Sequence, residues 1–205
     1  KASRPVSLYG ATKLASDKMF VASNSYSGEH KTQFSVVRYG NVMGSRGSVI
    51  PFFIQEKNNG VLPITDNRMT RFMITLEEGV ELVWKAFDDM CGGEIYVKKI
   101  PSMKVTDLAS AIDKDAVQKV IGIRPGEKLH EEMIGEDDSL YTYEYDNYYK
   151  ILPAINNWFH SKELIKNGKP VEKGFSYTSN NNTEWMSIET LQEWIKNNKN
   201  KIGKF

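Results

Sequence analysis

Cysteine is almost absent from this sequence. Its 205 residues include one cysteine, Cys91, so an internal disulfide is excluded and a reducing compartment, the cytoplasm, is expected. We expect Cys91 to be a small buried residue that follows a helix. No apolar run approaches the roughly 20 residues that are needed to span a bilayer, so no membrane partner is expected.

Metal-ligand spacing and an excess of one charge are also lacking. The three histidines, His30, His130 and His160, have no metal-ligand spacing with one another or with Cys91, and no metal site is predicted. The 27 basic and 26 acidic residues leave a net charge of +1, without a basic block. No nucleic-acid partner is therefore expected. The tyrosines between residues 141 and 149 lie in an acidic segment, which argues against base stacking there.

An initiator methionine and a signal peptide are missing as well. The chain starts Lys1-Ala2-Ser3-Arg4-Pro5, and we expect that it begins inside a longer protein. With 40% hydrophobic and 26% charged residues, the composition is that of a globular protein. The length fits one domain, or a domain with a small partner.

The segments that are present alternate between helical and extended patterns. Helices are predicted from Leu8 to about Ser25, from near Pro51, from Thr75 to about Met90, over Val105–Ile112 and after Ser187. Extended segments are predicted over residues 32–39, 61–64, 94–97 and 119–123. A glycine-punctuated loop, residues 40–48, follows the first strand. This alternation is typical of an α/β protein with a parallel sheet, where ligands bind at the carboxyl ends of strands.

The first helix carries the pattern that points to chemistry. Ser7 is its predicted N-cap, and its apolar residues are expected to form a buried stripe: Leu8, Ala11, Leu14, Ala15, Met19, Phe20 and Ala22. Tyr9 and Lys13 are four residues apart, so they share one face. An ammonium beside a phenol favours the phenolate, which can take a proton from an alcohol. On spacing alone, the simpler interpretation is an exposed helix with Lys13 in solvent.

Three further strings accompany this pair. They are Arg-Tyr-Gly-Asn-Val-Met-Gly-Ser-Arg-Gly-Ser-Val at residues 38–49, Met-Thr-Arg-Phe-Met-Ile-Thr at 69–75 and Gly-Ile-Arg-Pro-Gly-Glu-Lys-Leu-His-Glu at 122–131. In this order and spacing, the four motifs resemble the extended short-chain dehydrogenases that act on nucleotide sugars. More narrowly, they resemble the inverting UDP-N-acetylglucosamine 4,6-dehydratases of the pseudaminic acid pathway. The resemblance runs from Lys1 to about Trp194.

The resemblance implies a fold. Residues 1–48, with 75–100 returning to them, would be the C-terminal part of a Rossmann-type doubly wound parallel sheet. Residues 49–205 would mainly form a small α/β substrate-binding lobe, in which Trp158, Trp185 and Trp194 are packing residues. The family's Gly-x-Gly-x-x-Gly turn after a strand has no counterpart here. We therefore expect that the chain by itself neither binds NADP tightly nor turns over substrate.

The resemblance also implies a reaction. A lyase of this family, with NADP or alternatively NAD, would oxidise the hexose at carbon 4 and eliminate water across carbons 5 and 6. The hydride would return to carbon 6, with inversion at carbon 5. Tyr9 would be the base of the first step, Lys13 would assist it and bind the nicotinamide ribose, and Lys1 would be the base at carbon 5.

Binding residues follow from the same resemblance. Val42, Met43, Gly44, Ser45 and Arg46 would line the cofactor together with Tyr9 and Lys13. Asn41, Val49, Asn67, Arg124 and Glu127 would bind the UDP-sugar. The Arg124 guanidinium suits a diphosphate and the Glu127 carboxylate suits ribose hydroxyls, although a surface ion pair on a proline-glycine turn is the alternative. The family also implies a homo-oligomer.

Two alternatives stay open at this point. The chain could belong to another nucleotide-sugar enzyme of the superfamily, a 4-epimerase or a retaining dehydratase. Lys1, eight residues before Tyr9, favours the inverting dehydratase because an epimerase needs no base at carbon 5. The other alternative is a non-catalytic, truncated module whose exposed strand edges promote aggregation.

Overall fold

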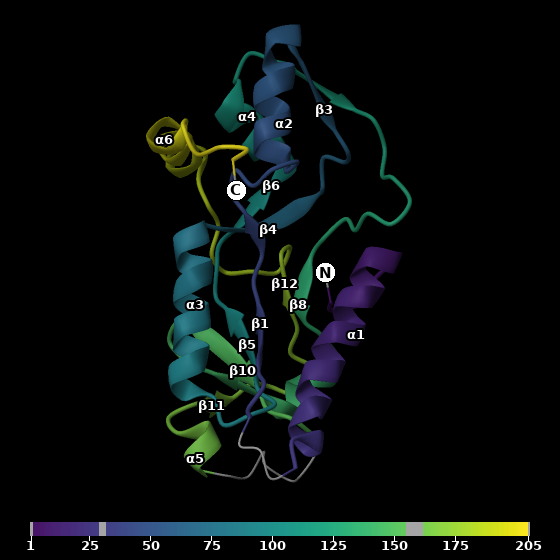
Figure 1. Ribbon diagram of the computed structural model, residues 1–205. Coiled ribbons are helices and arrows are strands. Elements are labelled where there is room, and N and C mark those ends of the chain that lie inside the picture. Colours follow the sequence, from purple (N-terminus) through teal and green to yellow (C-terminus); the bar gives the residue numbers. More distant parts are fainter. Residues whose placement is uncertain (1, 29–31, 155–161, 205) are drawn as a thin grey trace. The chain divides into compact units, whose positions relative to one another are not determined.

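A computed structural model describes residues 2–28, 32–154 and 162–204 (Figure 1). The chain forms two compact units, each with its own helices and strands. The first unit contains residues 1–39, 77–99 and 132–178, and the second contains residues 40–76, 100–131 and 179–205. The predicted α/β class is confirmed. The glycine loop of residues 40–48, grouped by the sequence with the first strand, packs in the second unit.

A five-stranded sheet organises the first unit, in the order β1-β5-β10-β9-β11. β1 (Val36–Arg38) and β5 (Ile95–Lys98) are parallel, and β10 (Tyr148–Ile151), β9 (Thr142–Glu144) and β11 (Lys169–Pro170) continue the sheet in antiparallel pairs. A separate pair joins β8 (Glu132–Ile134) to β12 (Tyr177–Thr178). The helices are α1 (Leu8–Ser23), α3 (Leu76–Asp89) and α5 (Lys162–Ile165), with 3-10 turns at Asn24–Tyr26 and Glu136–Tyr141.

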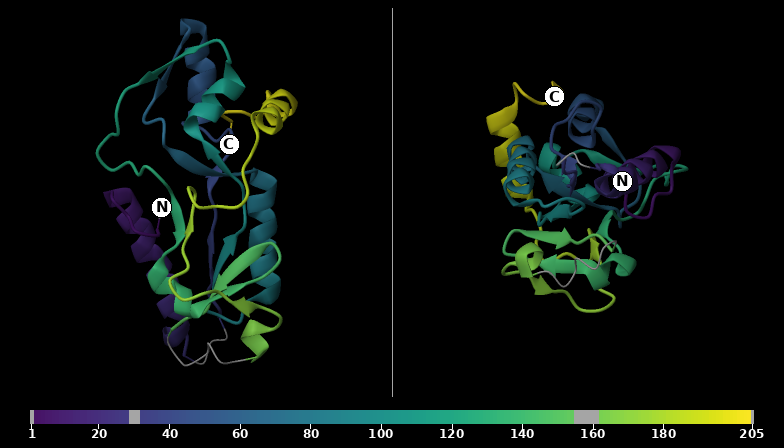
Figure 2. Two further views of the ribbon diagram at one scale, coloured as in Figure 1. Left: turned by 180° about the vertical axis from the view of Figure 1, so that it is seen from behind. Right: turned by 60° about the horizontal axis from the view of Figure 1, so that its bottom comes forward.

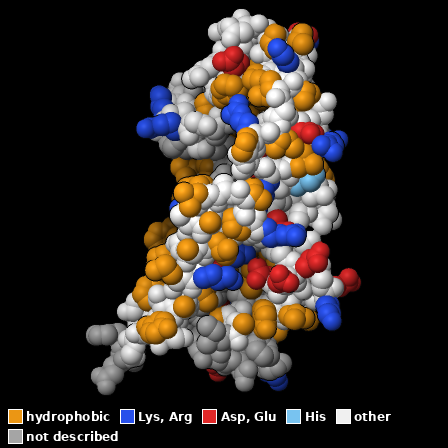
Figure 3. All heavy atoms as spheres, turned by 90° about the vertical axis from the view of Figure 1, so that its right-hand side faces the viewer, with side chains coloured by type: hydrophobic (Ala, Val, Ile, Leu, Met, Phe, Trp, Pro, Cys, Tyr) orange, Lys and Arg blue, Asp and Glu red, His pale blue; other side chains and the backbone are white. Residues whose placement is uncertain are grey.

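Helix α1 begins where the sequence predicts. The Ser7 hydroxyl accepts a hydrogen bond from the Gly10 N–H at 3.2 Å and so caps the first turn. The expected apolar stripe is wrong, because Leu8 is 83% and Met19 is 68% exposed. Gly10 and Asp17 are the buried residues of this helix instead. Small and apolar residues occur all around α1, so their spacing did not define which side faces the protein. Figure 3 shows hydrophobic side chains mixed with charged ones on the face of the molecule that carries α1.

Cys91 also differs from expectation. It follows α3, as predicted, but its side chain is exposed rather than buried. The neighbouring Glu94 carboxylate accepts hydrogen bonds from the Cys91 and Gly92 N–H groups, at 2.7 and 2.8 Å. This turn points the backbone inward and leaves the thiol outside.

The second unit is built on β4 (Thr70–Ile74). β2 (Asn41–Val42) pairs with it in parallel and β6 (Ser102–Lys104) in antiparallel orientation, while β3 (Val61–Ile64) pairs in parallel with β7 (Val117–Val120). The helices are α2 (Val49–Glu56), α4 (Val105–Ile112) and α6 (Ile188–Asn198), with a 3-10 turn at Lys57–Asn59. α4 lies against both α2 and α6 (Figure 2). The core between them gathers aliphatic and methionine side chains, among them Ile50, Phe53, Leu62, Met73, Leu108 and Leu191.

Candidate functional site

Tyr9 and Lys13 occupy the first two turns of α1 in the first unit. The Lys13 ammonium nitrogen lies 5.5 Å from the centroid of the Tyr9 ring, and both side chains are exposed. The structure therefore brings the predicted pair together on one accessible side of the helix. Lys1, the third predicted catalytic residue, lies outside the described residues.

An ion-pair network fixes α1 to the sheet. At the end of β1, Arg38 donates from Nε to Asp17 Oδ2 at 2.9 Å, and from Nη1 to the Met133 carbonyl at 2.9 Å and to Asp138 Oδ2 at 3.3 Å. Arg38 and Asp17 are both buried. Their pairing is what holds the inner side of α1, and hence the direction in which Tyr9 and Lys13 point. No role for Arg38 was predicted from the sequence, although an arginine within an apolar strand is a signal for a buried ion pair.

A cavity of about 380 Å³ opens beside this network. Basic side chains (Arg4, Lys18 and Arg38) and acidic ones (Glu132, Glu136, Asp137 and Asp138) line it, together with Ala2, Ser3, Leu14 and Gly135. Two of the lining residues are hydrogen-bonded, because Ser3 Oγ donates to Glu132 Oε1 at 2.8 Å. Tyr9 and Lys13 do not line this cavity, so it is separate from the predicted catalytic pair.

The glycine loop after β2 lies in the second unit. Asn41 and Val42 pair with Met73 and Ile74 of β4, which places Asn41 at the start of the loop. The Met43 side chain packs in the core, whereas Arg46 is exposed.

Gly44 is the residue at which this loop needs glycine. Its φ is +73°, and a Cβ there would stand 2.8 Å from the Trp194 ring. Its carbonyl accepts the Gly203 N–H at 2.7 Å, so the C-terminal segment supports the loop.

The other predicted binding residues belong to the second unit too. Val49 is the first residue of α2. Asn67 is exposed between Asp66 and Arg68, which form a compact ion pair with Arg68 Nη2 2.9 Å from Asp66 Oδ2. Hydrogen bonds from the Arg68 side chain and backbone lower the pKa of Asp66 to about 2, so this loop keeps its paired charges at neutral pH.

Arg124 and Glu127 form the two ends of a tight turn. The Glu127 N–H donates to the Arg124 carbonyl, the Arg124 N–H donates to Glu127 Oε2 (both 3.1 Å), and Gly126 has a φ of +84°. The Arg124 side chain is exposed. The turn therefore presents an exposed guanidinium next to a carboxylate that uses one of its oxygens, Oε2, in this turn contact.

Arg71 anchors the chain that leads out of this turn. Its Nη1 donates to the carbonyls of Thr70 and Leu129 at 2.7 and 3.2 Å, and its Nη2 donates to the Lys128 carbonyl at 2.9 Å. Its Nε lies 3.7 Å from Glu131 Oε1. No role for Arg71 was predicted from the sequence, because Lys128 and Leu129, whose carbonyls it binds, are more than 50 residues away.

Two negative findings concern the described residues. Within residues 2–28, 32–154 and 162–204, no helix is both long and apolar enough to cross a bilayer. In the same ranges, no group of three or more histidine, cysteine and acidic side chains is arranged to hold a metal ion.

Parallel strand pairs, a glycine loop directly after a strand and an exposed tyrosine–lysine pair on a helix define a Rossmann-type α/β protein. Residues 1–153 match the family model described as polysaccharide biosynthesis protein, and the chain belongs to that family.

Named relatives narrow the class. The chain is 56% identical, over 202 residues, to the UDP-N-acetylglucosamine 4,6-dehydratase (inverting) of Campylobacter jejuni serotype O:2, covering 95% of this chain and 60% of the relative. It is 35% identical to a UDP-glucose 4-epimerase of Rickettsia bellii, covering 96% of this chain and 59% of that one. Among solved structures, Pen from Bacillus thuringiensis superposes with a TM-score of 0.81 at 33% identity, covering 97% of this chain and 59% of that chain. The chain thus spans about 60% of the length of the relatives it matches.

Proposed function

We propose that this chain forms the catalytic-pair and substrate-binding part of an inverting UDP-N-acetylglucosamine 4,6-dehydratase. The observation that carries the proposal is the Tyr9–Lys13 pair, with the ammonium 5.5 Å from the phenol ring on an exposed side of α1. The 56% identity to the Campylobacter jejuni dehydratase supports the proposed dehydratase function. The 35% identity to an epimerase is the reason to keep a UDP-sugar 4-epimerase as the second candidate.

Tyr9 accepts the proton of the carbon-4 hydroxyl in this proposal. Lys13, whose ammonium nitrogen lies 5.5 Å from the centroid of the Tyr9 ring, is proposed to assist Tyr9 and to bind the nicotinamide ribose. The resulting ketone makes the carbon-5 proton acidic, and Lys1 is proposed as the base that removes it. A carboxylic acid that the resemblance places outside this chain would protonate the carbon-6 hydroxyl, which leaves as water. A bound nicotinamide would supply the hydride acceptor for the oxidation at carbon 4 and the hydride donor for the reduction at carbon 6.

The residues present fit such a cofactor. In the first unit, Tyr9 and Lys13 are accessible for ribose hydroxyls. In the second unit, the exposed Arg46 precedes Gly47, which faces open space and allows close approach of a phosphate. We propose Val42, Met43, Gly44 and Ser45 as the rest of this lining. NADP is the proposed cofactor, and NAD is the alternative.

The substrate side is proposed for the second unit. The exposed Arg124 guanidinium would pair with the diphosphate and the outer Glu127 oxygen would accept from the ribose hydroxyls. Asn41, Val49 and Asn67 would complete the contacts to the UDP-sugar. We further propose a cytoplasmic homo-oligomer that acts in pseudaminic acid synthesis, with no nucleic-acid, membrane or metal partner.

To test the proposal, this chain is joined to the part of the Campylobacter jejuni relative that the alignment leaves uncovered. With UDP-N-acetylglucosamine, mass spectrometry should detect loss of water in the chimera, and Tyr9→Phe should lower that rate by about 10²–10⁴-fold. Tyr26→Phe is the matched control, because Tyr26 is also an exposed tyrosine, in the turn after the same helix, and should leave the rate unchanged. A product of unchanged mass with inverted carbon 4 would favour the epimerase. Full activity of Tyr9→Phe would refute the role of Tyr9.

A further inference from the structure

Ser3 and Glu132 form a buried hydrogen bond although they are 129 residues apart in the sequence. Ser3 Oγ donates to Glu132 Oε1 at 2.8 Å, and the two residues are 8% and 9% exposed. Glu132 is the first residue of β8, and Ser3 lies in the segment that leads into α1. The hydrogen bond therefore ties this segment to a strand of the first unit.

The backbone next to Ser3 has a strained conformation. Arg4 has a φ of +45°, in the left-handed region that is costly for a residue with a Cβ. Such a conformation persists only where surrounding contacts hold it. The Arg4 side chain is 78% exposed and its Nη1 lies 3.5 Å from Glu132 Oε2, so this contact adds little. The buried Ser3–Glu132 hydrogen bond is the stronger of the two contacts that fix the segment to Glu132.

Gly135 lies against the same hydrogen bond. Its φ is −87°, a value that any residue adopts, so the backbone conformation does not explain why a glycine stands there. A Cβ at this position would lie 3.2 Å from Glu132 Oε1 and 3.8 Å from Ser3 Oγ. The missing side chain thus leaves room for the carboxylate oxygen that accepts from Ser3.

An adjacent cavity makes this hydrogen bond important for the position of the segment. Ala2, Ser3, Arg4 and Glu132 all line the cavity of about 380 Å³ described above. In a closely packed interior, neighbouring atoms would oppose a shift of the chain, but atoms that border an open cavity lack such neighbours on one side. The position of residues 2–4 therefore depends on a directional contact more than on packing.

We propose that Glu132 is a positioning residue that acts through Ser3 on Lys1, the base proposed for carbon 5. This inference rests on the proposed function. Lys1 itself lies outside the described residues, and Ser3 follows it by two positions in the sequence. Because two residues of chain span at most about 7 Å, a fixed Ser3 limits how far residue 1 reaches.

Different contacts hold the two proposed bases. Tyr9 belongs to α1, whose inner side is fixed by the ion pair of Asp17 with Arg38. Loss of the Ser3–Glu132 hydrogen bond should therefore slow removal of the carbon-5 proton and leave the oxidation at carbon 4 unchanged. A misplacement of a reacting group by about 1 Å lowers a rate by up to about 10²-fold.

The first experiment is a double-mutant cycle on the 205-residue chain, followed by urea unfolding. Ser3→Ala should change the unfolding equilibrium constant about fivefold in the parent and have little effect when Glu132→Met has already removed the acceptor. Ser23→Ala is the matched control. Ser23 also donates a 2.8 Å hydrogen bond, to the Met19 carbonyl, so its effect should be the same in both backgrounds. An additive cycle for Ser3 and Glu132 would overturn the proposed anchoring.

The second experiment separates the two chemical steps in the chimera with the Campylobacter jejuni relative. Mass spectrometry follows the loss of water, and the absorbance of the reduced nicotinamide follows the oxidation at carbon 4. Ser3→Ala and Glu132→Met should each slow water loss about 10- to 10²-fold, while the reduced nicotinamide forms at the parent rate and persists for longer. Glu132→Gln keeps an oxygen that accepts from Ser3 and should restore most of the rate.

The remaining outcomes distinguish the positioning role from the proposed function. Unchanged water loss in Ser3→Ala and Glu132→Met, or equal slowing of both steps, would overturn the positioning role even if the cycle shows coupling. A parent chimera that neither oxidises nor dehydrates the UDP-sugar would contradict the proposed function and with it the role assigned through Lys1. A coupled cycle would in that case still establish the anchoring of Ser3 by Glu132.

Discussion

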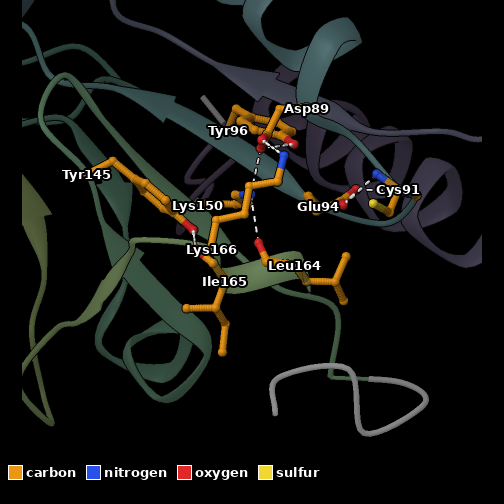
Figure 4. Close-up of polar contacts among 10 residues, drawn as sticks. Asp89, Cys91, Glu94, Tyr96, Tyr145, Lys150, Leu164, Ile165 and Lys166 are labelled. Atoms are coloured by element: carbon orange, nitrogen blue, oxygen red, sulfur yellow. Dashed lines mark hydrogen bonds and ion pairs between the residues drawn. The ribbon is translucent and has the colours of Figure 1, made fainter. Parts of the chain in front are cut away.

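The ammonium of Lys150 lies 2.6 Å from Asp89 Oδ2 in the interior of the first unit, with 1% of the lysine side chain exposed. Figure 4 shows Lys150 reaching from β10 to the end of α3, where the Tyr96 hydroxyl also donates to Asp89 Oδ2, at 2.9 Å. Lys150 donates in addition to the Leu164 carbonyl at 2.9 Å, and Lys166 pairs with the other Asp89 oxygen. The Asp89 carboxylate at the end of α3 thus contacts Tyr96 of β5, Lys150 of β10 and Lys166, which follows α5.

Asp89→Asn should destabilise the chain by about 3–5 kcal/mol, because the buried Lys150 ammonium loses its counter-charge. Lys150→Met should cost less, since Asp89 keeps Lys166 and Tyr96. The double variant should recover part of the loss of Asp89→Asn. Urea unfolding measures all three, with Lys169→Met at an exposed lysine as the control. Equal stability of Asp89→Asn and the parent would contradict the role given to this pair.

The contribution of Asp89 to stability should depend on pH in acidic solution. Burial acts to raise the pKa of Asp89, but hydrogen bonds from Lys150 and Lys166 outweigh it and lower the pKa to about 2. A lowered folded-state pKa contributes stability that is complete above the unfolded value of about 3.9 and is lost as the pH falls towards 2. The free energy of unfolding should therefore fall more steeply between pH 4 and 2 in the parent than in Asp89→Asn. Parallel pH profiles for the two proteins would show that Asp89 is not the group responsible.

Gly44→Ala should destabilise the second unit more than Gly47→Ala. Both glycines have a positive φ, +73° and +71°, so each substitution brings a backbone cost of about 1–2 kcal/mol. Only at Gly44 does the new Cβ meet a neighbour, the Trp194 ring at 2.8 Å, whereas Gly47 faces open space. Thermal unfolding should rank the two variants in this order, and Trp194→Leu should lessen the difference. The reverse ranking would contradict a steric clash between a Cβ at residue 44 and the Trp194 ring.

Arg38→Met should loosen α1. It leaves the buried Asp17 carboxylate without its cation, and Asp17 Oδ1 already has no hydrogen-bond partner among the described residues. We expect amide exchange in α1 to increase at least about tenfold, since removing one partner of a buried pair costs several kcal/mol. Arg4→Met removes only a 3.5 Å contact of a largely exposed arginine and serves as the control. Unchanged protection of α1 in Arg38→Met would show that other contacts hold the helix.

Local signals in the sequence were enough for much of the secondary structure. Val61–Ile64 and Val105–Ile112 have the predicted bounds, and Ser7 and Ser187 cap α1 and α6. Each depends on residues within one or two turns, where backbone preference and capping act directly. The first strand is shorter than predicted, Val36–Arg38. The Tyr9–Lys13 contact is also a local feature. Side chains four residues apart on a helix lie close together regardless of how the rest of the chain folds.

Tertiary structure decided which side of α1 is buried, because Asp17 can face the interior only where a cationic partner, here Arg38, lies beside it. It also decided the exposure of Cys91. The same holds for the hydrogen bonds of Thr70 with Ser179 and His130, which are 109 and 60 residues away in the sequence. No spacing rule relates residues so distant; their meeting depends on how strands and helices pack. The sequence by itself determined the helices, the caps and the spacing of Tyr9 and Lys13 on one helix, because these are short-range properties of the chain. Only the packed structure determined the buried charges and the hydrogen bonds of Arg71 to Lys128 and Leu129, because removing a polar group from water is favourable only when its partner is brought to it.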